Sequence, residues 1–222
     1  MSLEAAALVA WGTFVAVDLV TVPQGLFSRP LVAATVAGWL AGDVSAGLLA
    51  GAALEFYALE VLPIGAARYP DWGPAAVGGG MAAAWAPAGL ELGLAGLVAM
   101  PLAILGGWTL HVHRRRNAQS VVGRMARVDA GDARAIWELQ RNGLVRDAGR
   151  GLVLSVAALG AAATISELRW ADFPRATMLS WAVLAGGLAA AVSGAIRSAG
   201  AGNRRRWLAV GLATGLVAVL LR

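Results

Sequence analysis

The sequence predicts an all-α, polytopic helical membrane protein with broken or re-entrant helices in its N-terminal half. Of its 222 residues, 59% are hydrophobic and only 14% are charged, whereas an ordinary soluble domain carries about 25% charged residues. Several apolar stretches approach or reach the roughly 20 residues that a helix needs to cross a bilayer. The stretches of the N-terminal half are interrupted by proline, glycine and aspartate. This composition argues against a soluble enzyme, and it excludes a disordered chain, which would be rich in charge.

Residue types that carry common catalytic and metal chemistry are scarce. The chain has no cysteine, which rules out disulfides, thiolate metal sites and cysteine nucleophiles. Its two histidines, His111 and His113, are too few for a zinc site made mainly of imidazoles. No Ser/His or paired-Asp constellation has the spacing needed for nucleophilic or aspartyl chemistry. We therefore expect no catalytic residue, no metal ion and no cofactor.

The first apolar stretch, Leu3 to Val22, is predicted to be a retained transmembrane helix. It has no basic region at its start, unlike a signal peptide. Asp18 lies one turn from its end and is expected to reach toward the membrane interface. Residues 23–30 follow, and their two prolines and one glycine interrupt any helix.

The next stretch, residues 31–67, is apolar but broken twice. Leu31 to Ala41 is too short to cross a bilayer at 1.5 Å per residue, and Gly42-Asp43 follows it. Val44 to Leu62 is just long enough to cross and is followed by Pro63-Ile64-Gly65. This pattern is typical of a re-entrant hairpin or of discontinuous helices, which a bilayer tolerates only where protein or a polar cavity satisfies the freed backbone groups. For Asp43 we expect a helix-capping or hairpin-tip role rather than contact with a substrate.

The second half of the chain has one strongly basic segment. Nine of the eighteen arginines fall between residues 114 and 150, together with four acidic residues, and the net charge of +5 of this segment equals that of the whole chain. By the positive-inside rule we expect a cytoplasmic loop that contacts anionic lipid. Asp132 is predicted to cap a short helix, Ala133 to Asn142, with Gly143 at its end. Val121, Met125 and Val128 predict a second, amphipathic helix along the membrane surface.

Apolar spans flank this segment on both sides. Glu91 to His111 precedes it, and Gly151 to Ser166, Ala176 to Ile196 and Trp207 to Leu221 follow. We therefore divide the chain into three parts: residues 1–112, a transmembrane region with broken helices and the candidate binding site; 113–150, the Arg-rich cytoplasmic segment; and 151–222, the C-terminal transmembrane helices. A basic segment between apolar spans argues against nucleic acid as a partner.

An ordered series of motifs runs through residues 28–71. It comprises Ser28-Arg29-Pro30-Leu31-Val32, Gly42-Asp43-Val44, Gly47 to Glu55 (GLLAGAALE), Ile64-Gly65-Ala66-Ala67 and Pro70-Asp71. This series resembles the IIC component of the mannose/fructose/sorbose family of the bacterial phosphoenolpyruvate-dependent sugar phosphotransferase system (PTS). Beyond residue 110 the resemblance is looser and rests on the order and length of the segments. Pro63 departs from the pattern, because relatives often have asparagine there.

The resemblance implies a multi-pass, sugar-translocating subunit of the bacterial inner membrane that is not an enzyme by itself. It implies a IID membrane subunit as partner, in a trimer of such heterodimers. It also implies that a hexose-type sugar is phosphorylated on its way in by a IIB subunit, which is itself charged by IIA. The missing amide at Pro63 and the short C-terminal half leave an alternative open: a degenerate, non-transporting membrane scaffold or sensor of the same fold.

Recognition of a neutral hexose needs carboxylates and amides for the hydroxyls and an aromatic face for the ring. Carboxylates within membrane segments are functional candidates. The predicted substrate-binding residues are Glu55, Asp71, Gly65, Ala66, Gln24 and Trp72. For Glu55 the alternative is a structural partner of Arg29 or of backbone N–H groups at a helix break, and for Asp71 it is a helix N-cap. For Gly65 and Ala66 the alternative is a tight turn.

Overall fold

The structure is a computed structural model that describes residues 2–61, 68–170, 173 and 175–198, together with residues 206–207, 209–211 and 213–215. The helices are α1 (Leu3–Asp18), α2 (Pro30–Leu40), α3 (Val44–Ala58), α4 (Trp72–Ala84), α5 (Glu91–Val122), α6 (Met125–Asp129), α7 (Ala133–Ser166) and α8 (Met178–Ser198). The part of the chain that the structure describes contains no strand. The predicted all-α membrane fold is therefore confirmed, and α5, α7 and α8 are long and apolar enough to cross a membrane.

The breaks between the first three helices lie where the sequence predicts them. Pro30 begins α2 in the first helical position, where its missing N–H is not needed. Gly42 has a φ of +96°, a left-handed conformation that an L side chain rarely adopts. The Asp43 carboxylate then accepts a hydrogen bond from the backbone N–H of Ala46 at 2.9 Å and caps α3. The predicted capping role of Asp43 is confirmed.

Two predicted spans are shorter in the structure. The stretch from Leu3 forms a helix of 16 residues that ends at Asp18, and the stretch from Val44 forms one of 15 residues that ends at Ala58. Asp18 does not reach toward the interface, because its side chain turns back to bind the backbone of the following loop. The break predicted at Pro63-Ile64-Gly65 lies outside the described residues, as does most of the predicted span Trp207 to Leu221.

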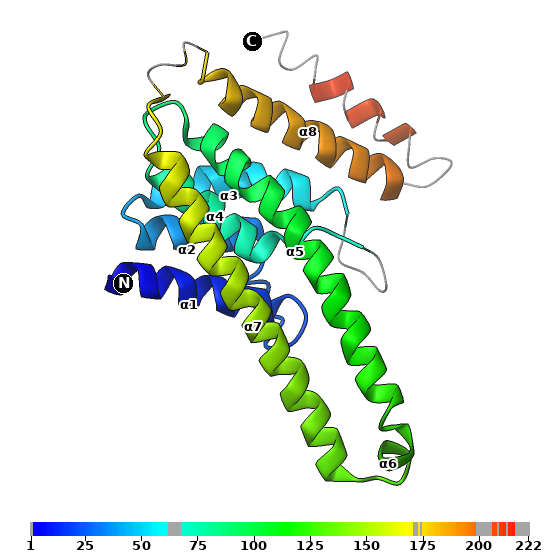
Figure 1. Ribbon diagram of the computed structural model, residues 1–222. Helices are drawn as coiled ribbons and strands as arrows, with labels where there is room; N and C mark the ends of the chain where they lie inside the picture. Colours follow the sequence, from blue (N-terminus) through cyan, green and yellow to red (C-terminus); the bar gives the residue numbers. More distant parts are fainter. Residues whose placement is uncertain are drawn as a thin grey trace.

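Small residues let the short helices pack closely around α4. A Cβ atom added to Gly47 of α3 would lie 2.6 Å from the carbonyl oxygen of Ala34 and 2.7 Å from the Cα of Gly38, both on α2. In α4, residues Gly73 to Ala83 are all buried, and the helix contacts α1, α2, α3, α5 and α7. Close backbone approach of this kind is typical of membrane helices, where the hydrophobic effect does not drive association. Figure 1 shows α4 inside the group formed by these helices.

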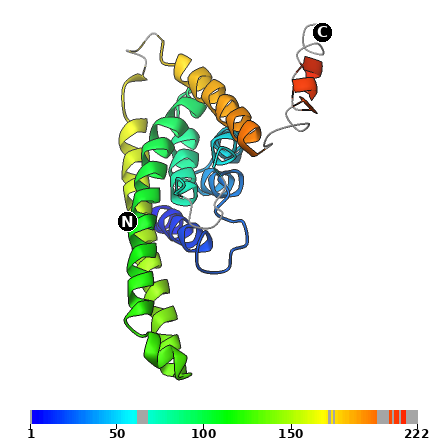
Figure 2. The same cartoon turned by 90° about the vertical axis from the view of Figure 1, so that its right-hand side faces the viewer.

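The basic segment is a helical hairpin and not a loop. Helices α5 and α7 have 32 and 34 residues, and their ends extend together beyond the short helices, with α6 at the tip (Figures 1 and 2). Asp132 caps α7 as predicted, by accepting from the N–H groups of Arg134 and Ala135. The expected helix end at Gly143 is wrong, because α7 continues to Ser166 and Gly143 lies against Asn117 of α5.

No separate amphipathic helix runs from Val121 through Val128 either, because Val121 belongs to α5 and Val128 to the five-residue α6. The boundaries drawn at residues 112 and 150 fall within α5 and α7. The three-part division thus describes the polarity of the chain and not breaks in its helices.

Candidate functional site

Glu55 joins the C-terminal half of α3 to the beginning of α2. One carboxylate oxygen forms an ion pair with the Arg29 guanidinium, and the other accepts a hydrogen bond from the backbone N–H of Leu31 at 3.1 Å. The side chains of Arg29 and Glu55 are 28% and 20% exposed. The pair is therefore fixed in position, yet within reach of a molecule that approaches it.

Arg29 is positioned by the irregular loop between α1 and α2. Asp18, which is 1% exposed, accepts hydrogen bonds from the backbone N–H groups of Gly25 at 2.6 Å and Ser28 at 2.9 Å. A buried carboxylate that accepts from two backbone donors holds an irregular segment in one conformation. Asp18 therefore orders the loop that presents Arg29 to Glu55.

Trp72 lies close by, in the first position of α4. Its ring packs against that of Tyr57, with 6.0 Å between the ring centroids. The Tyr57 hydroxyl donates to the carbonyl oxygen of Val183 in α8 at 2.7 Å. Among the residues that the structure describes, the buried indole N–H of Trp72 has no hydrogen-bond partner. Buried polar groups are nearly always paired, so this donor is a candidate for a ligand or water oxygen.

A small cavity lies between these residues. Its walls include Arg29, Trp72, Tyr69 and Pro70, and its volume is about 30 Å³. That volume is enough for one water molecule, whereas small-molecule sites usually measure about 300–1,000 Å³. The cavity in this structure is therefore too small for a ligand larger than water.

A buried charge network also lies at the start of α4. The Arg150 guanidinium of α7 pairs with Asp71 and with Asp147, which is one turn earlier on α7. The Arg150 side chain is 7% exposed and both carboxylates are 0% exposed. Asp147 also accepts from the Thr21 hydroxyl at 2.7 Å, and Asp71 accepts from the N–H of Gly73 at 3.3 Å. The network fastens the α1–α2 loop and the start of α4 to the hairpin.

A second contact joins the hairpin to the segment before α4. The Arg114 guanidinium of α5 donates to the Tyr69 hydroxyl and lies 4.8 Å from the centroid of the same ring. The backbone N–H of Asp71 donates to the carbonyl oxygen of Ala103 at 2.9 Å. Residues 69–72 are thus held by α5 and α7 together.

The chain is similar over most of its length to one known family. The family model of the PTS system sorbose-specific IIC component matches residues 2–196. The chain belongs to this family. It is accordingly an integral inner-membrane protein of the PTS, and the resemblance predicted from residues 28–71 is confirmed.

A relative of this IIC-family chain agrees with that assignment. A PTS system sorbose-specific EIIC component from Klebsiella pneumoniae is 35% identical over 78 residues. The aligned stretch covers 35% of this chain and 29% of the Klebsiella protein. A solved structure described only as that of a membrane protein matches with a TM-score of 0.76 and 21% identity, over 100% of this chain and 92% of the other. At that identity the match shows the fold alone.

The predicted site residues of this IIC-family chain fall into four groups. Trp72 and Arg29 line the small cavity, and Glu55 adjoins it through its ion pair with Arg29. Asp71 is buried against Arg150 and caps α4, so the capping alternative is confirmed. Gln24 is exposed and donates to the carbonyl oxygen of Val20 at 3.1 Å. Gly65 and Ala66 lie outside the described residues.

For Glu55, both alternative contacts, with Arg29 and with a backbone N–H, are present. Binding of sugar by these residues stays a prediction.

Sequence reasoning missed the Arg150–Asp147 network. The signal available was an Asp and an Arg three residues apart, directly before the apolar span that starts at Gly151. Both were counted as part of the basic segment. Among the described residues, no group of three or more His, Asp or Glu side chains lies close enough together to hold a metal ion.

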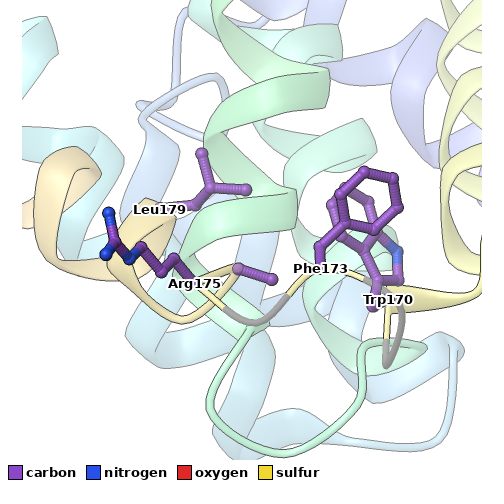
Figure 3. Close-up of a pocket in the computed structure, with 5 residues that line it drawn as sticks. Trp170, Phe173, Arg175 and Leu179 are labelled. Carbon is purple, nitrogen blue, oxygen red and sulfur yellow. The ribbon is translucent and has the colours of Figure 1, made fainter.

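Another pocket, of about 410 Å³, lies between the end of α7 and the start of α8. Figure 3 shows the rings of Trp170 and Phe173 together on one side of it and Arg175 directed away. The two ring centroids are 5.8 Å apart. None of the predicted substrate residues lines this pocket. We assign its aromatic residues to packing and to the membrane interface, where such rings are common.

Proposed function

We propose that this chain is the sugar-translocating IIC subunit of a PTS permease, and that it moves a hexose or a related sugar across the inner membrane. The observation that carries the proposal is the Arg29–Glu55 pair, which is partly exposed beside the Trp72 indole. The N–H of this indole has no hydrogen-bond partner among the described residues. A carboxylate accepts from sugar hydroxyls, a guanidinium donates to them, and an indole offers both a ring face and an N–H donor. No step requires a catalytic group on this chain.

Transport in this scheme requires the closed site to open. The cavity of about 30 Å³ must enlarge several-fold to reach the range of small-molecule sites. The helices around it are short and end at loops, as in transporters whose discontinuous helices bind substrate near the bilayer midplane. Sugar hydroxyls would then replace part of the contact between Arg29 and Glu55 and bind the Trp72 N–H.

The coupling to phosphorylation is part of the same proposal. The partners are a IID membrane subunit and the phosphocarriers IIB and IIA, with IIB phosphorylating the sugar as it arrives on the cytoplasmic side. By the family resemblance the assembly is a trimer of IIC–IID heterodimers. The basic hairpin of α5 and α7, with its positive net charge, identifies the cytoplasmic side.

The test compares two carboxylates of the same chain segment. In cells that express the chain with its IID, IIB and IIA partners, Glu55→Gln is expected to lower hexose uptake and phosphorylation about tenfold or more, because a hydrogen bond to a charged group is lost. Glu60→Gln is the control, since Glu60 pairs with Arg197 on an exposed surface at 2.9 Å. Uptake by Glu55→Gln at the wild-type rate would remove Glu55 from the site.

The scaffold alternative makes a different prediction for the wild-type protein. A non-transporting scaffold or sensor would give no uptake with any hexose or amino sugar, although the complex assembles. A panel of these sugars, tested for binding to the purified complex and for uptake, separates the two functions.

A further inference from the structure

A groove runs between α5 and α7 where the hairpin leaves the rest of the molecule. Its volume is about 620 Å³. One face of α5 lines it at Leu105, Trp108, Val112 and Arg116, which follow one another at intervals of three or four residues. One face of α7 lines the opposite wall at Arg146, Arg150, Val153 and Ala157, with the same spacing. The groove therefore follows the two helix axes.

The two ends of the groove differ in polarity because the helices are antiparallel. Arg116 lies late in its helix and Arg146 early in its own, so both are at the end toward the hairpin tip (Figure 1). Leu105 and Ala157 are both at the opposite end. Eleven residues separate the ends on each helix, or about 16 Å at 1.5 Å per residue. A basic end is thus continuous with an apolar channel.

The apolar walls belong to helices that can cross the membrane, and they are open to the surroundings. Trp108 is 65% exposed and Val153 is 69% exposed. The basic end lies at the boundary between the apolar part of each helix and its charged part, where a bilayer has its headgroups. Tryptophan is enriched at that level.

The two arginines at the basic end are suited to bind a phosphate. Arg146 is held across the groove by hydrogen bonds from one nitrogen, Nη1, to Ser120 Oγ at 3.0 Å and Asn117 Oδ1 at 3.3 Å. Within the described part of the chain, Arg116 has no carboxylate partner. Arg150 is different, because Asp71 and Asp147 already neutralise it.

We propose that this groove is a binding site for one anionic phospholipid of the cytoplasmic leaflet. Arg116 and Arg146 bind the headgroup phosphate, and an acyl chain lies along Trp108, Val112 and Val153. Basic pockets between membrane helices on the cytoplasmic side bind anionic headgroups in this way. A soluble anion would leave the apolar channel exposed to water, and a second copy of the hairpin would bring like charges together.

The test measures lipid binding to the purified full-length chain. After delipidation, phosphatidylglycerol and phosphatidylcholine are titrated separately and bound lipid is counted by native mass spectrometry. We expect one phosphatidylglycerol to bind in preference to phosphatidylcholine. In the double variant Arg116→Gln/Arg146→Gln its affinity is expected to fall about 30-fold, from the loss of two charges at the membrane surface. Arg134→Gln/Arg141→Gln removes the same charge from exposed positions on the hairpin outside the groove and is expected to bind as the wild type does.

Three results would overturn the proposal. Equal losses in the two double variants would indicate attraction by net charge without a site. Unchanged binding in Arg116→Gln/Arg146→Gln would exclude those arginines. Glycerol 3-phosphate lacks acyl chains. If it competed as strongly as the lipid does, the ligand would be a soluble phosphate. A Trp108→Ala variant, which keeps both arginines, is expected to weaken phosphatidylglycerol binding without affecting glycerol 3-phosphate, and helix content from circular dichroism checks that each variant is folded.

Discussion

The short helices α1 to α4 and the distal part of the α5–α7 hairpin differ in whether their charged side chains are paired or exposed to the surroundings. Among the short helices the charges at the candidate site have particular partners: Glu55 has Arg29, and Asp71 has Arg150. On the distal hairpin most arginines are exposed, and the pair Arg127–Asp132 lies at the surface at 2.7 Å. The first region sits among packed helices and the second extends beyond them (Figure 2).

This contrast indicates where a single substitution should have a large effect. A charge that is buried with one partner leaves that partner uncompensated when it is removed, whereas an exposed charge is replaced by water and screened by salt. The same holds for glycine, which is essential where two backbones touch and dispensable where the helix surface is open. Substitutions should therefore have large effects around α4 and small effects on the hairpin.

The largest effect is expected at Arg150. Arg150→Gln leaves two fully buried carboxylates without their cation and should destabilise the protein by about 3–5 kcal/mol. Thermal unfolding of the detergent-solubilised chain measures this loss. Adding Asp71→Asn to Arg150→Gln should restore part of the stability, and the exposed Arg134→Gln is the control. If Arg150→Gln and Arg134→Gln unfold at the same temperature, the contrast between the two regions is wrong.

Next in size is the contact of α2 with α3. Gly47→Val places a branched side chain where a Cβ alone would lie 2.6 Å from a carbonyl oxygen, and overpacking of this kind costs about 1–3 kcal/mol. Gly160→Ala is the matched control, because a Cβ at Gly160 of α7 meets nothing within 4 Å. Alanine there should leave stability equal or raise it by up to about 1 kcal/mol, its advantage over glycine in a helix. Thermal unfolding of both variants gives the comparison, and equal losses would contradict it.

A smaller loss of stability is expected at the partly exposed pair. Arg29→Gln removes an ion pair whose side chains are 28% and 20% exposed, so the free energy of unfolding should fall by about 1 kcal/mol or less. Hexose uptake should nevertheless fall clearly, because the guanidinium is part of the proposed site. A loss of stability as large as that of Arg150→Gln, with uptake per folded molecule unchanged, would make Arg29 a structural residue only.

The smallest effect is expected at the hairpin tip. The hydrogen bond from Arg127 lowers the pKa of Asp132 from its usual 3.8, and the backbone N–H of Ala135 lowers it further. Because the folded pKa is depressed, the carboxylate stabilises the start of α7 above pH 3.8 and loses this effect as the pH falls through the folded value. Hydrogen-exchange protection factors of residues 133–136 should decrease as the pH falls through the folded pKa of Asp132, with little change in the unfolding temperature. Asp132→Asn should remove the pH dependence, and an unchanged profile would exclude Asp132 as its source.

The breaks of the N-terminal half could be predicted because their causes are local. Proline at position 30 and the Gly42-Asp43 pair restrict the backbone wherever they occur, and the helix ends lie there in the structure. The rule failed at Gly143, where a local stop signal lies inside α7. The contact with α5 outweighs the roughly 1 kcal/mol that glycine costs in a helix.

The candidate site could be predicted only in part. Glu55 was identifiable because a carboxylate in an apolar segment needs a partner. Contacts with Arg29 or with a backbone N–H at a helix break were the predicted alternatives, and the structure shows both. Asp71 was identifiable as a cap, but its pairing with Arg150 spans 79 residues of sequence, and no local pattern indicates it. The Trp72 donor likewise becomes notable only when its surroundings are known.

From the sequence alone one could infer the membrane environment, the helix breaks before α2 and α3 and the family, and the positive-inside rule predicts a cytoplasmic position for the arginine-rich segment. Composition, backbone preferences and net charge decide these properties, and all of them are local or additive along the chain. The packing of the helices was needed to identify the buried arginine, the carboxylates it neutralises and the helical hairpin with its amphiphilic groove. Burial and ion pairing depend on distances between helices, and close packing of small residues sets those distances.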